Sequence, residues 1–358
     1  MVLENLDFDW ANDTKWYCIE GGANILAQNM EKVIAKKPVY QSPVTAIKQS
    51  RKRELHNLTV HVKGEPLPEK YAAVFNSTTL GAAQRMDLST AKLNYGTKQA
   101  IRTLNYGASC KVGIRFSRPW WINDLGIKGA GLGKTDLPIR VCVYPSYNIH
   151  DFVDEHGKPV DKPAVLLCSY TWEQDASRMG SLIRPDSPNG EEELKELLFR
   201  NLALLHSKKD NYKVMYDTIK SSYITHHAFN WYTDPYAAGA FAFFGPHQFQ
   251  EVWPDIVTPS ADGKLHFIGE AGSTHHAWVV GALESAIRGV FHFVTKNAKE
   301  YKEFLKVQEF MKNYQIGKDG KNPEGPFLPL PYNMEWDVAE HQVLVSEARA
   351  EGVIKEVL

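Results

Sequence analysis

Glu270, with Gly269 before it, is the residue of this sequence best placed to do chemistry. The apolar run Leu265–Ile268 predicts a short strand, and a helical pattern begins near Ala277 after a loop of small and polar residues. A carboxylate only accepts hydrogen bonds, so Glu270 at the carboxyl end of a strand would suit the hydroxyl groups of a ligand. The helix start beyond it offers free N–H groups and a positive dipole end, which suit negative charge. Ligand binding and simple packing account for this spacing equally well.

The helix that begins near Ala277 has two different faces. One is an apolar stripe at helical spacing, which consists of Val279, Leu283, Ile287, Val290 and Val294. The adjacent face has almost no side chains, because it consists of Gly281, Ser285, Gly289 and two alanines. The small face would let another part of the molecule or a ligand approach the backbone of this helix closely.

Two strand patterns carry further candidate residues. Residues 109–116 alternate between an apolar and a polar face, and Lys111 lies on the polar one. This alternation by itself predicts that Lys111 is solvated. Residues 164–172 form a mostly apolar strand that ends in Tyr170 and Trp172. These amphipathic aromatic residues suit the wall of a pocket, although core packing explains Trp172 equally well.

Helices and short strands alternate along the rest of the chain and must position these residues. Strands are expected at residues 39–47, 58–62 and 71–77, and helices at 24–34, 98–104, 191–207, 212–219 and from 294 to 314. Asn24 is a candidate cap for the first helix. We read residues 126–135 as a flexible loop, since Lys128 occupies the position where a phosphate-binding loop requires glycine. Nucleotide hydrolysis is therefore disfavoured.

Composition and charge exclude several classes of protein. The 358 residues are 43% hydrophobic and 23% charged, which is typical of a globular chain of one or two domains. The net charge of -1 provides no field that would attract nucleic acid or an anionic membrane. No apolar run approaches the ~18 residues of a membrane span, and the first residues lack the features of a signal peptide. We expect no membrane partner, and the cytoplasm is the default compartment.

A metal site is not expected from this sequence. The four cysteines lie far apart, without a C-x-x-C pair. Adjacent histidines occur at 226–227 and 275–276, but neighbouring side chains diverge and no H-E-x-x-H motif is present. Solvated or packed histidines explain both pairs better.

Several segments, in order, resemble the flavin-containing amine oxidases, and in particular the L-amino-acid oxidases. The resemblance covers residues 16–296. It is carried by the Gly-Glu, loop and small-residue helix at 269–294, by Lys-x-x-x-x-Phe at 111–116 with the Pro-Trp-Trp that follows, and by Trp-x-x-x-x-Tyr-x-x-Gly at 231–239. It implies a mixed α/β fold in which part of a Rossmann-like FAD-binding domain is joined to a mixed-sheet substrate domain.

The resemblance implies a role for each candidate residue. Lys111 would be the catalytic group and would hold a water against the flavin N5. Glu270 would bind the ribityl chain of FAD, and the start of the helix would face the pyrimidine side of the flavin. The full set of cofactor-binding residues would be Val44, Trp231, Gly269, Glu270, Trp278 and Val279. The substrate-binding residues would be Tyr170, Trp172, Phe241 and Trp278.

The resemblance also implies domains and a reaction. Residues 1–105 and 241–298 would belong to the FAD-binding domain, residues 106–240 to the substrate domain, and residues 299–358 to a C-terminal helix and tail. The reaction would be the oxidative deamination of an L-amino acid or related amine, with O2 as the oxidant and H2O2 as a product.

One departure from the family pattern leaves a second interpretation open. No strand leads through Gly-x-Gly-x-x-Gly into a helix, although in this family that unit holds the FAD pyrophosphate. The chain therefore resembles the C-terminal part of an oxidase. It would be either part of an oxidase that is complemented by an N-terminal segment, or a non-catalytic remnant or subunit that needs this missing part to bind FAD. Association of the chain into a homo-oligomer is a separate expectation.

Overall fold

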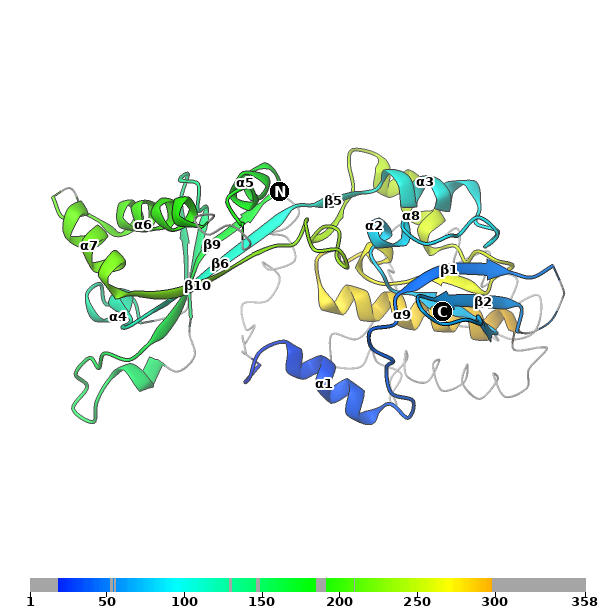
Figure 1. Ribbon diagram of the computed structural model, residues 1–358, viewed down its shortest axis with the longest axis horizontal. Helices are drawn as coiled ribbons and strands as arrows, with labels where there is room; N and C mark the ends of the chain where they lie inside the picture. Colours follow the sequence, from blue (N-terminus) through cyan, green and yellow to red (C-terminus); the bar gives the residue numbers. More distant parts are fainter. Residues whose placement is uncertain are drawn as a thin grey trace, which may run out of the picture.

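Two lobes joined by long strands make up the described part of the chain (Figure 1). The structure is a computed structural model that describes residues 19–297, except for 52–53, 55, 129–130, 146–148, 185–190 and 209. We call the lobe with the five-stranded sheet the sheet lobe, and the other the helix lobe. The mixed α/β fold class is confirmed, whereas the domain boundaries stay a prediction.

An antiparallel sheet with the strand order β10-β6-β9-β8-β7 is the centre of the sheet lobe. Its strands are β6 (Ser109–Phe116), β7 (Gly131–Lys134), β8 (Val141–Tyr144), β9 (Ala164–Trp172) and β10 (Tyr223–Asn230). The helices of this lobe are α4 (Trp120–Asn123), η2 (Ile149–Phe152), α5 (Glu173–Gly180), α6 (Glu192–His206) and α7 (Tyr212–Ser222). The predicted strands at 109–116 and 164–172 are confirmed.

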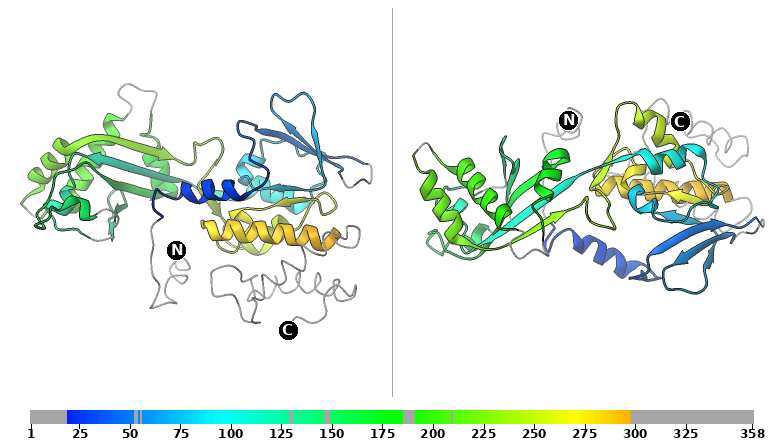
Figure 2. Two further views of the ribbon diagram at one scale, coloured as in Figure 1. Left: turned by 90° about the horizontal axis from the view of Figure 1, so that it is seen from below. Right: turned by 45° about the horizontal axis from the view of Figure 1, so that its top comes forward.

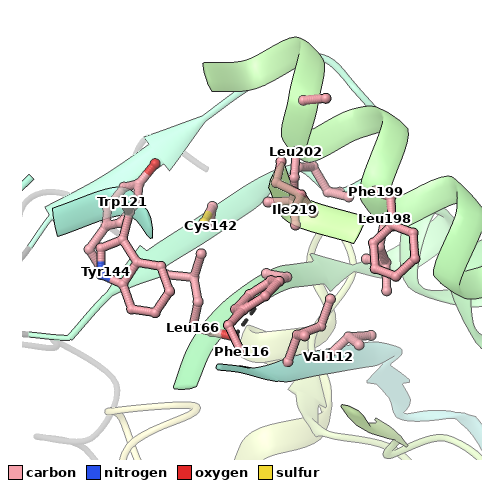
Figure 3. Packing of buried hydrophobic residues seen from close by; sticks show 14 of the residues in the cluster. Val112, Phe116, Trp121, Cys142, Tyr144, Leu166, Leu198, Phe199, Leu202 and Ile219 are labelled. Carbon is pink, nitrogen blue, oxygen red and sulfur yellow. Dashed lines mark hydrogen bonds between the residues drawn. The ribbon is translucent and has the colours of Figure 1, made fainter. Parts of the chain in front are cut away.

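The core of the sheet lobe lies between this sheet and helices α6 and α7. Figure 3 shows Val112 and Phe116 on the sheet, with Leu198 and Ile219 on the helices above them. Val112 and Phe116 are completely buried, while Lys111, which precedes Val112 in the alternation, is exposed. The inner face of β6 is therefore apolar because it packs against two helices, and the outer face is free for other contacts.

Among the described residues, the helix lobe combines two small sheets with six helical segments. Its elements are α1 (Asn24–Val33), β1 (Val44–Gln49), β2 (Leu58–Val62), β3 (Glu69–Tyr71), β4 (Val74–Asn76), α2 (Leu80–Ala83), α3 (Tyr95–Thr103), α8 (Gln248–Val257), β12 (Leu265–Phe267), η3 (Glu270–Gly272) and α9 (Val279–Asn297). Strands β1, β2 and β3 form an antiparallel sheet, and β12 pairs in parallel with β4. At the junction of the lobes, β5 (Asn105–Gly107) pairs antiparallel with β11 (Phe241–Phe243).

Helix α9 is buried along its small face, whereas its apolar stripe is buried only at its end, at Val294. Gly281, Ser285 and Gly289 are buried, whereas Val279 is 61% exposed and Val290 is 37% exposed. A side chain at position 281 would bring its Cβ within 2.2 Å of the His275 carbonyl oxygen, so only glycine permits this approach. The predicted extension of this helix to residue 314 lies outside the described residues.

Helix α1 also leaves its apolar residues uncovered. Figure 2 shows it on the outside of the helix lobe, extending toward the sheet lobe. None of its residues is buried, and Leu26, Met30 and Val33 are exposed. The expected cap is wrong: Asn24 is the first helical residue, and Ala23 at the cap position provides no side-chain hydrogen bond.

The loop expected at residues 126–135 is only partly correct. Residues 131–134 form the edge strand β7, because their backbone pairs with β8 from Val141 to Tyr144. The glycine-rich composition did not predict a strand, because glycine has a low strand propensity. Backbone pairing with β8 stabilises the strand here.

The described residues were also compared with the requirements of a membrane-spanning helix and of a metal site. None of the helices found between residues 19 and 297 has both the length and the apolar character needed to cross a bilayer. Within the same part of the chain, no three His, Cys, Asp or Glu side chains lie close enough together to hold a metal ion.

Candidate functional site

Strands β5, β6, β10 and β11 bring the predicted site residues to the junction of the lobes. Strand β5 leads directly into β6, and the Trp231 N–H at the end of β10 donates to the Ser109 carbonyl oxygen over 3.0 Å. Phe241 is paired with Gly107, two residues before the start of β6. These pairings place Lys111, Trp231 and Phe241 along the continuous run of chain from β5 into β6 and on the strands paired with it.

Lys111 lies against an aromatic pair on the outer face of the sheet. Its Nζ is 4.5 Å from the centre of the Tyr170 ring, and that ring is 4.1 Å from the Trp172 ring. Tyr170 is the residue paired with Lys111 across β6 and β9. Such a cation–π contact is worth ~0.5–1 kcal/mol at an exposed site, so it orients the ammonium group more than it stabilises the fold. The structure thus brings together three residues predicted to be in the site.

Trp231 extends this aromatic surface on the other side of Lys111. Phe229 is paired with Lys111 across β10 and β6, and its ring lies 4.6 Å from the Trp231 ring. Trp172 is 36% exposed, Trp231 38% and Trp278 43%. Tryptophan normally buries most of its large apolar surface, so three exposed indoles among the predicted site residues are suited to contact a flat ligand.

Glu270 points into the protein and accepts hydrogen bonds from two backbone segments. Both carboxylate oxygens accept from the Ala242 N–H, at 3.0 and 3.2 Å, and Oε1 also accepts from the Ala277 N–H at 2.9 Å. Burial raises the pKa of this carboxyl group, while the two backbone N–H donors act in the opposite direction. Glu270 therefore ties β11 to the segment that enters α9. A carboxylate has about four acceptor positions, so this arrangement leaves room for a ligand hydroxyl.

Phe241 is held in a crowded corner between β5 and the start of α5. A Cβ at position 107 would lie 2.6 Å from the Glu173 Oε1 and 3.2 Å from the Phe241 Cζ, so this corner requires glycine. Phe241 is only partly buried, and burial raises the pKa of Glu173. The aromatic ring and a partly desolvated carboxyl group are thus both close to Gly107.

Gly269, Trp278, Val279 and Val44 occupy the helix lobe. Gly269 has a φ of 106°, which lets the chain turn between β12 and η3. Trp278 and Val279 are exposed at the start of α9, where the first N–H groups of the helix lack intrahelical partners. Val44 is the first residue of β1, is paired with Val62 and is half-buried.

Two surface hollows lie elsewhere and do not mark this site. They have volumes of about 340 and 490 Å³ and lie along α5 and α6 in the sheet lobe. Their walls include Arg140, Asp175 and Leu197, and contain no residue predicted to be in the site. We base the site on the cluster around Lys111, because it combines a cation with exposed aromatic rings, and on Glu270, which accepts from Ala242, the residue after Phe241.

Two sets of contacts at this site could not be predicted from the sequence. The partners of Glu270 are the backbone N–H groups of Ala242 and Ala277, and no side-chain pattern could have indicated them. A second contact, between the His275 Nδ1 and the Glu284 Oε2 at 2.9 Å, joins the loop before α9 to the helix itself.

Comparison with known proteins identifies the family. A profile of the flavin containing amine oxidoreductases matches residues 7–290, which is most of the chain. The chain belongs to this family. Among its relatives, L-amino-acid oxidase 4 of Hebeloma cylindrosporum is 37% identical over 336 residues, and an L-amino-acid oxidase of Siganus canaliculatus is 31% identical over 295 residues.

The flavin-containing amine oxidoreductase fold is also found in the solved structures. A redesigned variant of putrescine oxidase matches with a TM-score of 0.57 over 77% of this chain and 53% of its own, at 16% sequence identity. This likeness confirms the fold only. The chain covers 90% of its own length but 51% of the Hebeloma protein in that match, and 80% against 50% for the Siganus protein. It therefore spans about half the length of the relatives that it matches.

Proposed function

We propose that this chain provides the substrate-binding half of an FAD-dependent oxidase that acts on an L-amino acid. The overall reaction would convert the amino acid, O2 and water to the keto acid, ammonia and H2O2. The observation that carries the proposal is the cluster of Lys111 with Tyr170 and Trp172, next to Trp231. The two relatives described above are named L-amino-acid oxidases, which supports an amino acid as the substrate class.

The residues at the junction fit a flat aromatic cofactor. FAD, when bound, would supply the acceptor for the hydride of the substrate, which carries both electrons of the oxidation. Trp231 and Trp278 would contact the ring system through their exposed faces. The N–H groups at the start of α9 would favour negative charge on the ring, and Glu270 would accept a hydrogen bond from the ribityl chain.

The substrate would lie against the outer face of β6 and β9. Tyr170 would donate its hydroxyl to the substrate carboxylate, and Trp172 and Phe241 would contact the side chain. Lys111 would hold a water molecule between substrate and cofactor, since its ammonium group has three hydrogen-bond donors and lies over the Tyr170 ring. The aromatic walls favour a substrate with an apolar side chain.

Titration of the purified chain with FAD tests this function. We expect the flavin to quench the tryptophan fluorescence of the chain, and the complex to be yellow and to form H2O2 when L-amino acids are added. The double variant Trp231→Leu and Trp278→Leu should lose most of the quenching, because it removes the indoles that face the ring. A chain that stays colourless and is not quenched at any FAD concentration, alone or with the remaining half of the Hebeloma enzyme, would identify it as a non-catalytic remnant.

Replacing Lys111 by methionine should lower the oxidase rate by roughly 100-fold, which is the usual effect of removing one charged group at a reaction centre. Methionine keeps the length and apolar stem of lysine, so flavin binding should change little. The matched control is Arg115→Met, since Arg115 is exposed on the same face of β6. The rate of H2O2 formation with saturating substrate measures the effect. Equal rates for the two variants would remove Lys111 from the reaction.

A further inference from the structure

The carboxylate of Glu173 borders the same space as the Phe241 ring. Glu173 begins α5, directly after Trp172 at the end of β9. Its backbone N–H donates to the Ala108 carbonyl oxygen over 2.9 Å, so α5 starts beside the point where β5 continues into β6 (Figure 1). A Cβ at Gly107 would meet the carboxylate and the edge of the ring together. The absence of a side chain at Gly107 therefore leaves room for both groups.

The backbone of Glu173 has a conformation that its residue type disfavours. Its φ is 50°, in the left-handed region, where the Cβ of an L-residue is crowded and glycine is preferred. Non-glycine residues in such conformations cluster at ligand-binding and active sites. Glycine would make the turn from β9 into α5 more readily, so the local backbone does not explain the glutamate. Its side chain, which reaches Gly107, is the remaining explanation.

The Glu173 carboxylate is partly desolvated and lacks a cationic partner. The residue is exposed as a whole, but partial burial of its carboxyl group raises the pKa of that group. In the part of the chain that the structure describes, the carboxylate takes part in no hydrogen bond or ion pair. Asp175 on the same helix, by contrast, is paired with Arg140 over 2.7 Å. Glu173 thus keeps a negative charge available for a ligand.

The candidate site residues follow one another along the strands and end at Glu173. Tyr170 is paired with Lys111, and Trp172 with Ser109. Glu173 comes next, opposite the connection from β5 to β6. A substrate whose carboxylate is bound by Tyr170 would extend past Trp172, and the end of its side chain would lie near Glu173.

We propose that Glu173 selects substrates whose side chain ends in a cation, as the side chain of L-lysine does. The apolar stem of such a side chain would lie against Trp172 and Phe241, and its charged end would donate to the carboxylate. An apolar side chain of the same length would leave the partly desolvated carboxylate without a partner. The inference rests on the proposed function for the position of the substrate, and it adds the class of side chain.

The α-ammonium group of the substrate is the other cation that Glu173 could bind. That group is attached to the carbon next to the carboxylate, which Tyr170 would hold, whereas Glu173 lies beyond Trp172. The order along the strand therefore favours the end of the side chain. An experiment can separate the two alternatives, because every L-amino acid has the α-ammonium group and only some have a second cation.

A comparison of L-lysine with L-norleucine tests the inference, because norleucine has an apolar stem without the terminal ammonium group. H2O2 formation by the full chain with FAD, alone or with the remaining half of the Hebeloma enzyme, gives kcat/KM for each substrate. We expect the parent chain to favour L-lysine, and Glu173→Gln to lower the ratio of lysine to norleucine by roughly 10-fold, since a charge-assisted hydrogen bond is lost. The control is Glu193→Gln, which removes the same charge from an exposed position on α6 and should keep the ratio of the parent chain.

Glu173→Gly separates substrate selection from stability. Glycine adopts a positive φ without strain, so this variant should unfold at the same or a higher urea concentration than Glu173→Gln. It should nevertheless show the same loss in the ratio of the two substrates. A glutamate that only supports the fold, or one that binds the α-ammonium group, would change kcat/KM equally for both substrates. An unchanged ratio in both variants would therefore overturn the inference.

NMR titration of the chain without FAD measures binding of the same two amino acids separately from the reaction. L-Lysine should bind more tightly than L-norleucine, and Glu173→Gln should remove this preference. A chain that shows the preference but forms no H2O2 would support the inference and contradict the oxidase function. Oxidation of both substrates at a ratio that does not depend on Glu173 would overturn the inference and support the oxidase function. No preference for L-lysine in either measurement would also overturn the inference.

Discussion

Replacement of Glu270 by alanine is expected to lower the free energy of unfolding by roughly 2 kcal/mol and to weaken flavin retention in the completed enzyme. The carboxylate is the acceptor for the Ala242 and Ala277 N–H groups. Ala242 is 3% exposed, so its N–H would be left buried without a partner, whereas Ala277 is exposed and can bond to water. Most of the loss in stability should therefore come from Ala242. Urea unfolding followed by circular dichroism measures it.

Glu270→Gln separates the structural role of this residue from its role toward the cofactor. The amide keeps one acceptor oxygen and so should recover about half of the lost stability, but it offers fewer acceptor positions to a ligand hydroxyl. We expect the glutamine variant to fold well and still lose flavin on dialysis. If Glu270→Ala unfolds at the same urea concentration as the parent chain, the hydrogen bonds of Glu270 do not stabilise the junction.

Acidification is expected to unfold the helix lobe through His266. This side chain is 3% exposed, is stacked on Phe75 at 4.8 Å and meets Phe293 edge-on. Burial lowers its pKa from 6.5 to about 4, the nearby Lys296 charge acts in the same direction, and the hydrogen bond to the Gly263 carbonyl opposes it. The unfolded chain therefore binds a proton at a higher pH than the folded chain does.

This difference in proton binding lowers the free energy of unfolding as the pH falls. The stabilisation is complete above pH 6.5 and is lost as the pH falls toward about 4, and the loss amounts to roughly 3 kcal/mol. His276, whose pKa burial also lowers to about 4, should add a similar dependence. His266→Phe should accordingly remove about half of the loss in stability across this range.

Urea unfolding at a series of pH values measures this effect. The result is the slope of the free energy of unfolding against pH. The control is His227→Phe, because His227 is exposed on β10, and it should keep the slope of the parent chain. An unchanged slope in His266→Phe would show that His266 is protonated equally in the folded and unfolded states.

Much of the scaffold could be predicted because its patterns are local. The alternation of residues 109–116 predicted a strand with one buried face, and the structure buries Val112 and Phe116 while Lys111 is exposed. The leucine spacing of residues 191–207 likewise predicted the helix observed at Glu192–His206. Strand β7 was missed, because its own residues favour turns and its pairing with β8, the next strand along the chain, stabilises it.

In the candidate site, the sequence likewise indicated residue types, but it did not indicate which groups these residues contact. The sequence indicated Glu270 as an acceptor, but its observed partners are backbone groups seven and twenty-eight residues away. The contact between Lys111 and Tyr170 depends on the register of β6 against β9, which no single segment specifies. The burial of the small face of α9 depends on what packs there, namely Phe75 and Ile268.

The sequence by itself determined the family, the order of most helices and strands, and which residues could bind a cation, a carboxylate or a flat ring. These properties depend on residue type and on spacings of a few positions, which are fixed along the chain. Tertiary structure alone decided that Lys111 faces Tyr170, that Glu270 joins β11 to the start of α9, and that the small face of α9 is buried. Each of these depends on how segments distant in sequence pair and pack, because hydrogen bonding and burial act between neighbours in space.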